Sequence, residues 1–273
     1  MSVINTNVKS LVAQNALTVN SRALSKTMEQ LSTGKRINSA ADDAAGLGIS
    51  NKMTAQIRGL NQAVRNANDG ISMLQTAEGA TQEITNMLQR MRELAVQAAN
   101  DTYSADDRTA LGKEVTELET EITRIATNTK WNGKEILKTE TPVSLQVGID
   151  SSTFSDVSIT LKDMTADSGL GVANLDLTGH TAAQGSLDKI DAAITKVDSF
   201  RADLGAKVNR LNYAADNLSN VSQNTAASRS RIADTDYAQA TTELARTQII
   251  QQAATAMLAQ ANQAPSSVLS LLQ

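Results

Sequence analysis

Few residues in this chain have types and spacings that could support catalysis or metal binding. There is one histidine, His180, and no cysteine, which excludes thiol nucleophiles, disulfides and thiolate metal sites. His180 follows Gly179 in a polar stretch, without a second histidine or a carboxylate cluster at ligand spacing, and we interpret it as a surface turn residue. The sequence contains no glycine-rich phosphate loop, serine elbow or zinc motif. We therefore expect no catalytic residue, metal site or cofactor.

Two pairs of adjacent aspartates could act as metal ligands or as an acid pair. They are Asp42 with Asp43 and Asp106 with Asp107. In each pair one aspartate lies three residues after a serine, and this spacing is typical of a capping box, in which both side chains bond free amides of a starting helix. We favour the capping role, because negative charge is also stabilising at a helix N-terminus. The pairs then indicate two helix starts, the first near Ala41.

The composition favours long helices over a β-rich enzyme. Of 273 residues only 2% are aromatic, with 14 glycines and 2 prolines. The net charge of -4 is mixed along the chain, so no basic stripe is available for nucleic acid. No stretch is long and apolar enough for a membrane span, and residues 1–20 lack the pattern of a secretory signal. We expect no nucleic acid or membrane partner, and export without a cleavable signal peptide.

Aliphatic residues recur at helical spacing in two long stretches. One stripe begins at Met53, changes register after Leu74 and continues to Ala98, and the other runs from about Leu187 past Leu218. Such stripes are satisfied by other helices. We predict a helix from about residue 41 to 99, roughly 80 Å long, a shorter helix after Ser104, and another long helix through the second stripe.

Both ends of the chain have helical periodicity but no aromatic anchors. Helices are predicted for residues 5–31 and for a last segment after residues 230–234. Burial within either segment alone does not offset the entropy lost on ordering it. We therefore expect the ends to be disordered in the monomer and to fold against each other and against neighbouring subunits. The residues expected to carry these inner contacts are Val8, Leu11, Leu17, Leu24, Leu31, Leu244, Ile250, Met257 and Leu258.

The middle of the chain changes from helical to strand periodicity. Asn132 and Gly133 form a hairpin-type turn signal, and apolar residues alternate strictly over residues 143–149 and 157–161. A small β element is expected at about residues 131–180. The predicted fold is mainly α: a long antiparallel helical rod or coiled coil formed by both chain ends, with a small β-hairpin element in the middle.

Several long motifs, in the same order along the chain, resemble those of bacterial flagellins. The N-terminal motifs cover residues 31–46 (LSTGKRINSAADDAAG), 66–72 (NANDGIS) and 88–97 (LQRMRELAVQ). The C-terminal motifs cover residues 228–238 (SRSRIADTDYA), 248–252 (QIIQQ), 258–262 (LAQAN) and 268–272 (VLSLL). The resemblance covers nearly the whole chain except about residues 138–185. Because it consists of several long motifs in the same order, it is highly specific.

This resemblance implies a subunit that polymerises head-to-tail into the flagellar filament and serves motility. It implies a terminal coiled-coil domain of residues 1–38 and 233–273 in the inner filament core, and a helical rod domain of residues 39–232. The short middle segment identifies a minimal type without outer domains. An extracellular filament location is implied, with export through the flagellum-specific channel.

The partners that the resemblance implies are further copies of the chain, a flagellar export chaperone, the filament cap and hook-filament junction proteins, and host innate immune receptors. A Toll-like receptor contact maps onto Arg90, Leu94 and Glu114, and intracellular sensors read C-terminal leucines that match Leu269, Leu271 and Leu272.

Three alternatives remain at this point. A hook-filament junction protein shares the terminal pattern but forms a short collar, so long filaments of the pure protein would exclude it. A soluble coiled-coil adaptor or receptor-binding module predicts ordered ends in the monomer and no polymer. A filament that is also an enzyme needs an inserted catalytic domain, for which the middle segment is short and lacks ligands.

Overall fold

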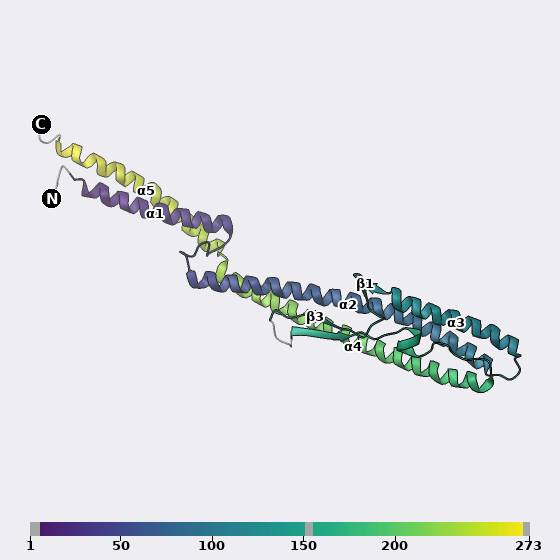
Figure 1. Ribbon diagram of the computed structural model, residues 1–273. Coiled ribbons are helices and arrows are strands. Elements are labelled where there is room, and N and C mark those ends of the chain that lie inside the picture. Colours follow the sequence, from purple (N-terminus) through teal and green to yellow (C-terminus); the bar gives the residue numbers. More distant parts are fainter. Residues whose placement is uncertain (1–5, 151–154, 270–273) are drawn as a thin grey trace. The chain divides into compact units, whose positions relative to one another are not determined.

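The computed structural model describes residues 6–150 and 155–269, with side chains to residue 263 (Figure 1). The chain divides into two compact units. Unit 1 comprises Met1–Ile57 and Gln223–Gln273, and unit 2 comprises Arg58–Ser222. Two long helices, α2 (Ala44–Ala98) and α4 (His180–Ala233), contribute to both. Among the described helices, none combines the length and hydrophobicity that a membrane span requires.

Unit 1 pairs the two terminal helices, α1 (Val8–Thr33) and α5 (Tyr237–Leu269), which lie side by side (Figure 1). Asn7 caps α1, because its side chain accepts a hydrogen bond from the Ser10 amide at 3.2 Å. Gly34 ends the helix with a φ of 70°, a left-handed conformation that glycine adopts without strain. The helices predicted at both ends are confirmed.

The start of α2 differs from the prediction. The helix begins at Ala44 and its cap is Asp43, whose Oδ1 accepts a hydrogen bond from the Gly46 amide at 2.8 Å. Asp42 instead accepts hydrogen bonds from the Asn38 and Ser39 amides at 3.2 and 3.1 Å. The expected capping box is therefore a separate turn that precedes the helix.

At the start of α3 (Ala105–Asn128) the predicted capping box is confirmed. The Ser104 hydroxyl accepts a hydrogen bond from the Asp107 amide at 3.2 Å, and the Asp107 carboxylate accepts one from the Ser104 amide at 3.1 Å. His180 is exposed, as expected, but it is the first residue of α4 and not part of a turn. Its Nδ1 contacts the Ala99 carbonyl at the end of α2. The sequence pattern missed this start because the first turns of α4 lack an apolar stripe.

Unit 2 holds the main hydrophobic core, formed where α2, α3 and α4 lie together. The stripes predicted on these helices are confirmed, since their members are among the most deeply buried residues. They include Leu74, Ile84, Leu88 and Met91 of α2, Val115 and Ile122 of α3, and Ile190, Val197, Leu204 and Leu211 of α4. The exception is Arg201, since the neighbouring Phe200 is the buried residue at that turn.

Two antiparallel hairpins complete unit 2. Strands β1 (Lys130–Trp131) and β2 (Lys134–Glu135) join through Asn132 and Gly133, whose φ angles of 47° and 78° fit a tight hairpin turn. Strands β3 (Pro142–Gln146) and β4 (Asp156–Thr160) form the second hairpin. The π-helical turn η2 (Ala166–Leu170) then precedes α4. The predicted β element is confirmed, although β3 ends three residues earlier than the alternation suggested.

The second hairpin packs against α2 through a glycine. A Cβ atom at Gly70 would overlap the Cδ1 atom of Leu145 on β3, whereas a Cβ atom at Gly79 of the same helix would meet nothing within 4 Å. The Asn66 side chain also donates a hydrogen bond to the Gln146 carbonyl at 3.0 Å. Leu145 of β3 therefore packs directly over Gly70 of α2.

We predict opposite effects for the same substitution at these two glycines. Gly79→Ala should stabilise the chain by about 0.5–1 kcal/mol, because alanine loses less backbone entropy in a helix. Gly70→Ala should destabilise it and increase amide exchange in β3 and β4, since the added methyl group displaces Leu145. Thermal unfolding with hydrogen exchange measures both effects. Leu145→Ala in the Gly70→Ala background should restore part of the loss, and stabilisation by Gly70→Ala alone would contradict the close contact.

Candidate interaction surface

The seam between α1 and α5 contains buried polar side chains. Asn20, Thr27 and Thr247 are buried, together with Ala240 of α5. Asn20 Nδ2 donates to the Thr247 carbonyl at 2.8 Å, and Asn7 Nδ2 donates to the Ala261 carbonyl at 2.7 Å. The two bonds show that the helices run antiparallel, since a step forward along α1 matches a step backward along α5. Side-chain to backbone hydrogen bonds therefore help to join this pair.

Several large aliphatic and methionine side chains of the pair are nevertheless exposed. Their exposed fractions range from 41% at Ile250 to 67% at Met257. In ordinary two-helix packing the apolar stripes face each other, and an exposed apolar patch on a protein surface often marks an interaction site. The exposed set comprises Val8, Leu11, Val12, Val19 and Met28 of α1 and Ile249, Ile250 and Met257 of α5.

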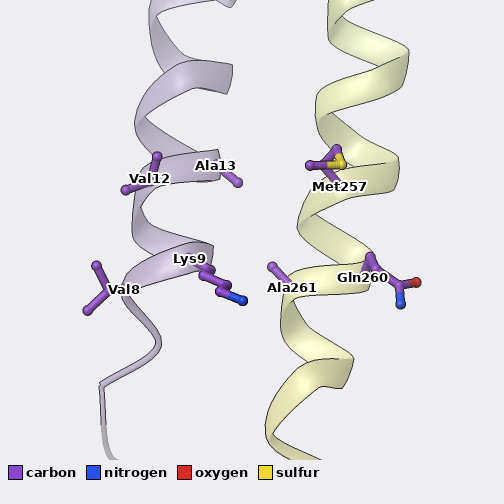
Figure 2. Close-up of a pocket in the computed structure, with 7 residues that line it drawn as sticks. All are labelled: Val8, Lys9, Val12, Ala13, Met257, Gln260 and Ala261. Atoms are coloured by element: carbon purple, nitrogen blue, oxygen red, sulfur yellow. The ribbon is translucent and has the colours of Figure 1, made fainter. Parts of the chain in front are cut away.

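Some of these side chains line a groove between the two helices, with a volume of about 520 Å³. In Figure 2, Lys9 and Ala13 lie on the side of α1 that faces α5, and Ala261 lies on the side of α5 that faces α1. The full lining is Val8, Lys9, Val12, Ala13, Met257, Gln260 and Ala261. Because it is mainly apolar and open, the groove offers an interaction surface for another polypeptide.

The nine predicted contact residues fall into two groups. Four are exposed on the pair, namely Val8, Leu11, Ile250 and Met257. Five are half-buried, namely Leu17, Leu24, Leu31, Leu244 and Leu258. The sequence-based selection omitted the exposed Val12, Val19, Met28 and Ile249, which a wider apolar sector on each helix would have included. Their role in assembly stays a prediction.

The register of the pair is fixed by two turns that bond to each other. Lys35 and Asp234 form an antiparallel bridge, and the Thr235 amide donates to the Gly34 carbonyl at 3.0 Å. The Arg36 amide donates to the Ala233 carbonyl at 2.7 Å, and its guanidinium donates to the Ile232 carbonyl at 2.6 Å. Neither helix can slide along the other without breaking these bonds.

A second set of candidate residues lies in unit 2. Arg90 of α2 forms a 2.9 Å ion pair with Glu114 of α3 and a 3.0 Å ion pair with Glu93. Hydrogen bonding to Glu114, and then to Glu93, raises the pKa of the Arg90 guanidinium above its ordinary value. Leu94 is only 1% exposed and packs in the core, next in position to this ion pair, and the receptor contact of these three residues stays a prediction.

The C-terminal candidates are described only in part. Leu269 is the last residue of α5, but its side chain, and Leu271 and Leu272 altogether, lie outside the described residues. Of the aspartates considered for metal binding, Asp43 and Asp107 cap helices. Among the described residues, no group of three or more histidines, aspartates and glutamates is placed to hold a metal ion.

Paired terminal helices with exposed apolar side chains are typical of a structural protein that binds other polypeptide chains. Comparison with known families agrees. The bacterial flagellin N-terminal helical region matches residues 4–141, and the bacterial flagellin C-terminal helical region matches residues 187–272. The chain belongs to the flagellin family, whose members are extracellular subunits of the bacterial flagellar filament.

Two relatives show the extent of the match. The flagellin of Halalkalibacterium halodurans is 47% identical, and the alignment covers 99% of this chain and 100% of that protein. Flagellin A of Vibrio cholerae is 38% identical, with 99% of both chains covered. The second alignment extends over 375 positions, many more than the 273 residues of this chain. The Vibrio cholerae protein therefore carries inserted segments that this chain lacks.

A solved structure of a putative flagellar hook-associated protein from Vibrio parahaemolyticus is also similar. Its TM-score is 0.59 at 14% identity, and the match covers 71% of this chain and 100% of that one. At this identity the likeness shows a shared fold alone. It does not favour a junction role over a filament role.

The turn before α2 is tied to α1 by a charge pair whose pH dependence can be predicted. Lys26 Nζ lies 2.9 Å from Asp42 Oδ1. Hydrogen bonding to Lys26, and then to the Ser39 and Asn38 amides, lowers the pKa of Asp42 from 3.8 to about 2. The ionised carboxylate is therefore the stabilising form. Its contribution is complete above about pH 4 and is lost as the pH falls toward 2.

We predict that Lys26→Met raises the Asp42 pKa toward 3.8, because it removes the largest cause of the shift. The carboxyl carbon shift of Asp42, followed by NMR between pH 6 and pH 1.5, measures this change. Lys35→Met is the control: this lysine lies in the neighbouring turn and bridges Asp234 through its backbone, so it should leave the Asp42 pKa near 2. An unchanged pKa in Lys26→Met would show that the ion pair does not form.

Proposed function

We propose that this chain polymerises head-to-tail through its terminal helices to build the flagellar filament, and so serves motility. The observation that carries this proposal is the outward-facing apolar set on α1 and α5, which the chain itself leaves uncovered. Contacts between unlike faces of identical subunits continue into an open helical polymer when the rotation does not close a ring. Neighbouring copies then bury the surface that a monomer exposes to water.

In this proposal residues 1–38 and 233–273 form the inner filament core, and residues 39–232 form the surrounding rod. The antiparallel pairing of α1 with α5 supports the first assignment. The three-helix core of unit 2 supports the second. Family membership supports three further partners. They are an export chaperone, which binds the C-terminal segment, the filament cap, and the hook-filament junction proteins.

The nearest alternative is a hook-filament junction protein, which forms a short collar. The two readings differ in the length of the assembly, because a filament subunit adds to its own polymer without limit. The purified chain should therefore form long filaments by itself in electron micrographs, whereas collars or short rings would favour the junction role.

We predict that Val12→Ala and Met257→Ala weaken polymerisation without altering the monomer. Both side chains are more than 60% exposed, so the monomer should change by less than about 0.5 kcal/mol. In the polymer each truncation removes roughly 1–2 kcal/mol of apolar burial, which corresponds to about a tenfold higher critical concentration. Sedimentation of polymer and circular dichroism of monomer measure the two effects.

A matched variant and a contrasting variant make this test specific. Val12→Ile keeps an aliphatic group of similar shape and should polymerise normally. Asn20→Ala removes the buried hydrogen bond to Thr247, so it should increase amide exchange along α1 and α5 in the polymer, where the two helices are paired. Unchanged polymerisation of both alanine truncations would refute the assigned surface. Strong amide protection of both terminal helices in the dilute wild-type monomer would instead show that they are ordered before assembly.

We further propose that Arg90 and Glu114 form part of a surface that innate immune receptors bind. Their side chains are 51% and 45% exposed and are joined across α2 and α3, so one planar guanidinium and one carboxylate are presented together. Leu94 supports this surface from the core beneath it. The C-terminal leucines remain candidates for intracellular sensors.

For this surface we predict that Arg90→Ala and Glu114→Ala each reduce binding to a purified Toll-like receptor ectodomain by about tenfold or more. Arg92→Ala is the matched control, since Arg92 is similarly exposed but pairs with Asp191 of α4. Surface plasmon resonance with monomeric protein gives the affinities. Equal losses in all three variants would point to general electrostatic attraction, and no loss in the first two would exclude the surface.

A further inference from the structure

The two hairpins and α2 enclose a cavity beside Trp131, the one tryptophan of the chain. This Trp131 cavity has a volume of about 260 Å³. Pockets for drug-sized ligands usually measure roughly 300–1,000 Å³, so the Trp131 cavity is better matched to a single large side chain. Its apolar lining comes from Met73, Trp131, Ile136, Val143, Leu145 and Leu161.

Polar residues also line the Trp131 cavity. Asp69, Lys134 and Thr141 contribute to its lining, together with Glu135. Glu135 already pairs at 3.5 Å with two lysines outside the cavity. An apolar lining beside an indole ring, with hydrogen-bonding groups in the same lining, favours an aromatic side chain that has a polar tip. Among the standard amino acids this describes tyrosine best.

The chain presents such a side chain on another face of the same unit. Tyr213 of α4 is 77% exposed, more than any other large apolar side chain in the described part of the chain. Leu211, two residues earlier, is fully buried and lies against α2, where a Cβ atom at Gly70 would be 3.4 Å from its Cδ1 atom. Residues two apart on a helix point roughly 200° apart. Tyr213 therefore points away from α2.

Tyr213 and the Trp131 cavity lie at the same level of unit 2. Gly70, which faces Leu211, is itself part of the lining of the Trp131 cavity. Tyr213 is thus less than one helical turn along the rod from the cavity, yet it faces another direction. It cannot fill the cavity of its own chain, but it is placed to meet the cavity of a chain that lies alongside.

We propose that Tyr213 of one copy inserts into the Trp131 cavity of a second copy, beside the contacts of the terminal helices. The ring packs against Trp131 and the aliphatic lining, and the hydroxyl reaches the polar groups of the lining. Tyr213 and the Trp131 cavity are different surfaces of the chain. Each copy therefore inserts its Tyr213 into one neighbour and accepts the Tyr213 of another, so the contact can propagate without closing on itself. This contact rests on the proposed function, since it requires a polymer of parallel copies.

Cross-linking tests the contact directly, because the chain contains no cysteine. Asp69→Cys and Tyr213→Cys are prepared as separate full-length variants, mixed in equal amounts, polymerised and treated with a short bis-maleimide. The expected product is a covalent dimer in the mixed polymer and none in polymers of either variant alone. A chain that carries both cysteines should give a ladder of oligomers, and a dilute monomer mixture should give no dimer.

The single tryptophan provides a second, independent readout. Acrylamide quenching of Trp131 should fall severalfold when the wild-type monomer polymerises, and Tyr213→Phe should behave likewise because it keeps the ring. Tyr213→Ala should raise the critical concentration about tenfold or more, and Trp131 should remain as accessible in its polymer as in its monomer. Val96→Ala, which truncates an exposed aliphatic residue of α2, is the control and should retain the fall in quenching.

The outcomes separate this inference from the proposed function. A wild-type chain that forms no polymer overturns both. A normal polymer in which the mixed cysteine variants stay monomeric on gels, or in which Trp131 is quenched as strongly as in the monomer, overturns the Tyr213 contact alone. A Trp131 signal that responds to free 4-methylphenol in the monomer but not to polymerisation would identify a small-molecule site and would also overturn it.

Discussion

The rest of the structure depends on what joins the two ends of the chain. Between α1 and α5 polar side chains such as Asn20 and Thr247 are buried, five leucines are only half-buried, and a further set of aliphatic side chains is exposed. Hydrogen bonds of this kind fix geometry but add little net stability, about 1 kcal/mol each. The pair is therefore well specified and weakly held. Part of its hydrophobic surface stays exposed in the single chain, which is the physical condition for a subunit that assembles.

Unit 2, in contrast, buries its own hydrophobic surface. Its helices bury large aliphatic side chains completely, with Leu88, Met91 and Ile122 in one continuous core. This unit can be stable before assembly and can carry surface features at fixed positions. The exposed Arg90 and Glu114 pair depends on that rigidity, because the two residues come from different helices. The fold thus separates a self-sufficient part from a part that other copies complete.

The helices and hairpins could be predicted from sequence where local chemistry dominates. The capping box at Ser104 and the Asn132–Gly133 turn are determined by groups a few residues apart, and both were predicted correctly. Predictions that depend on distant partners were less successful. The cap of α2 falls on Asp43 because Lys26 of another helix engages Asp42. The burial of Leu94 likewise depends on the core around α2, which a family motif does not describe.

The position of the hairpins has a consequence for how this protein can change over evolutionary time. Strands β3 and β4 meet as neighbours, with Gln146 paired to Asp156, so additional chain can be inserted between them while both anchoring strands stay in place. The entropy cost of lengthening a loop grows only slowly, by about 0.6 kcal/mol for each doubling. The helices on either side of this site need not change. An additional domain can thus be gained or lost between β3 and β4. The paired terminal helices are selected separately, for their contacts in the polymer.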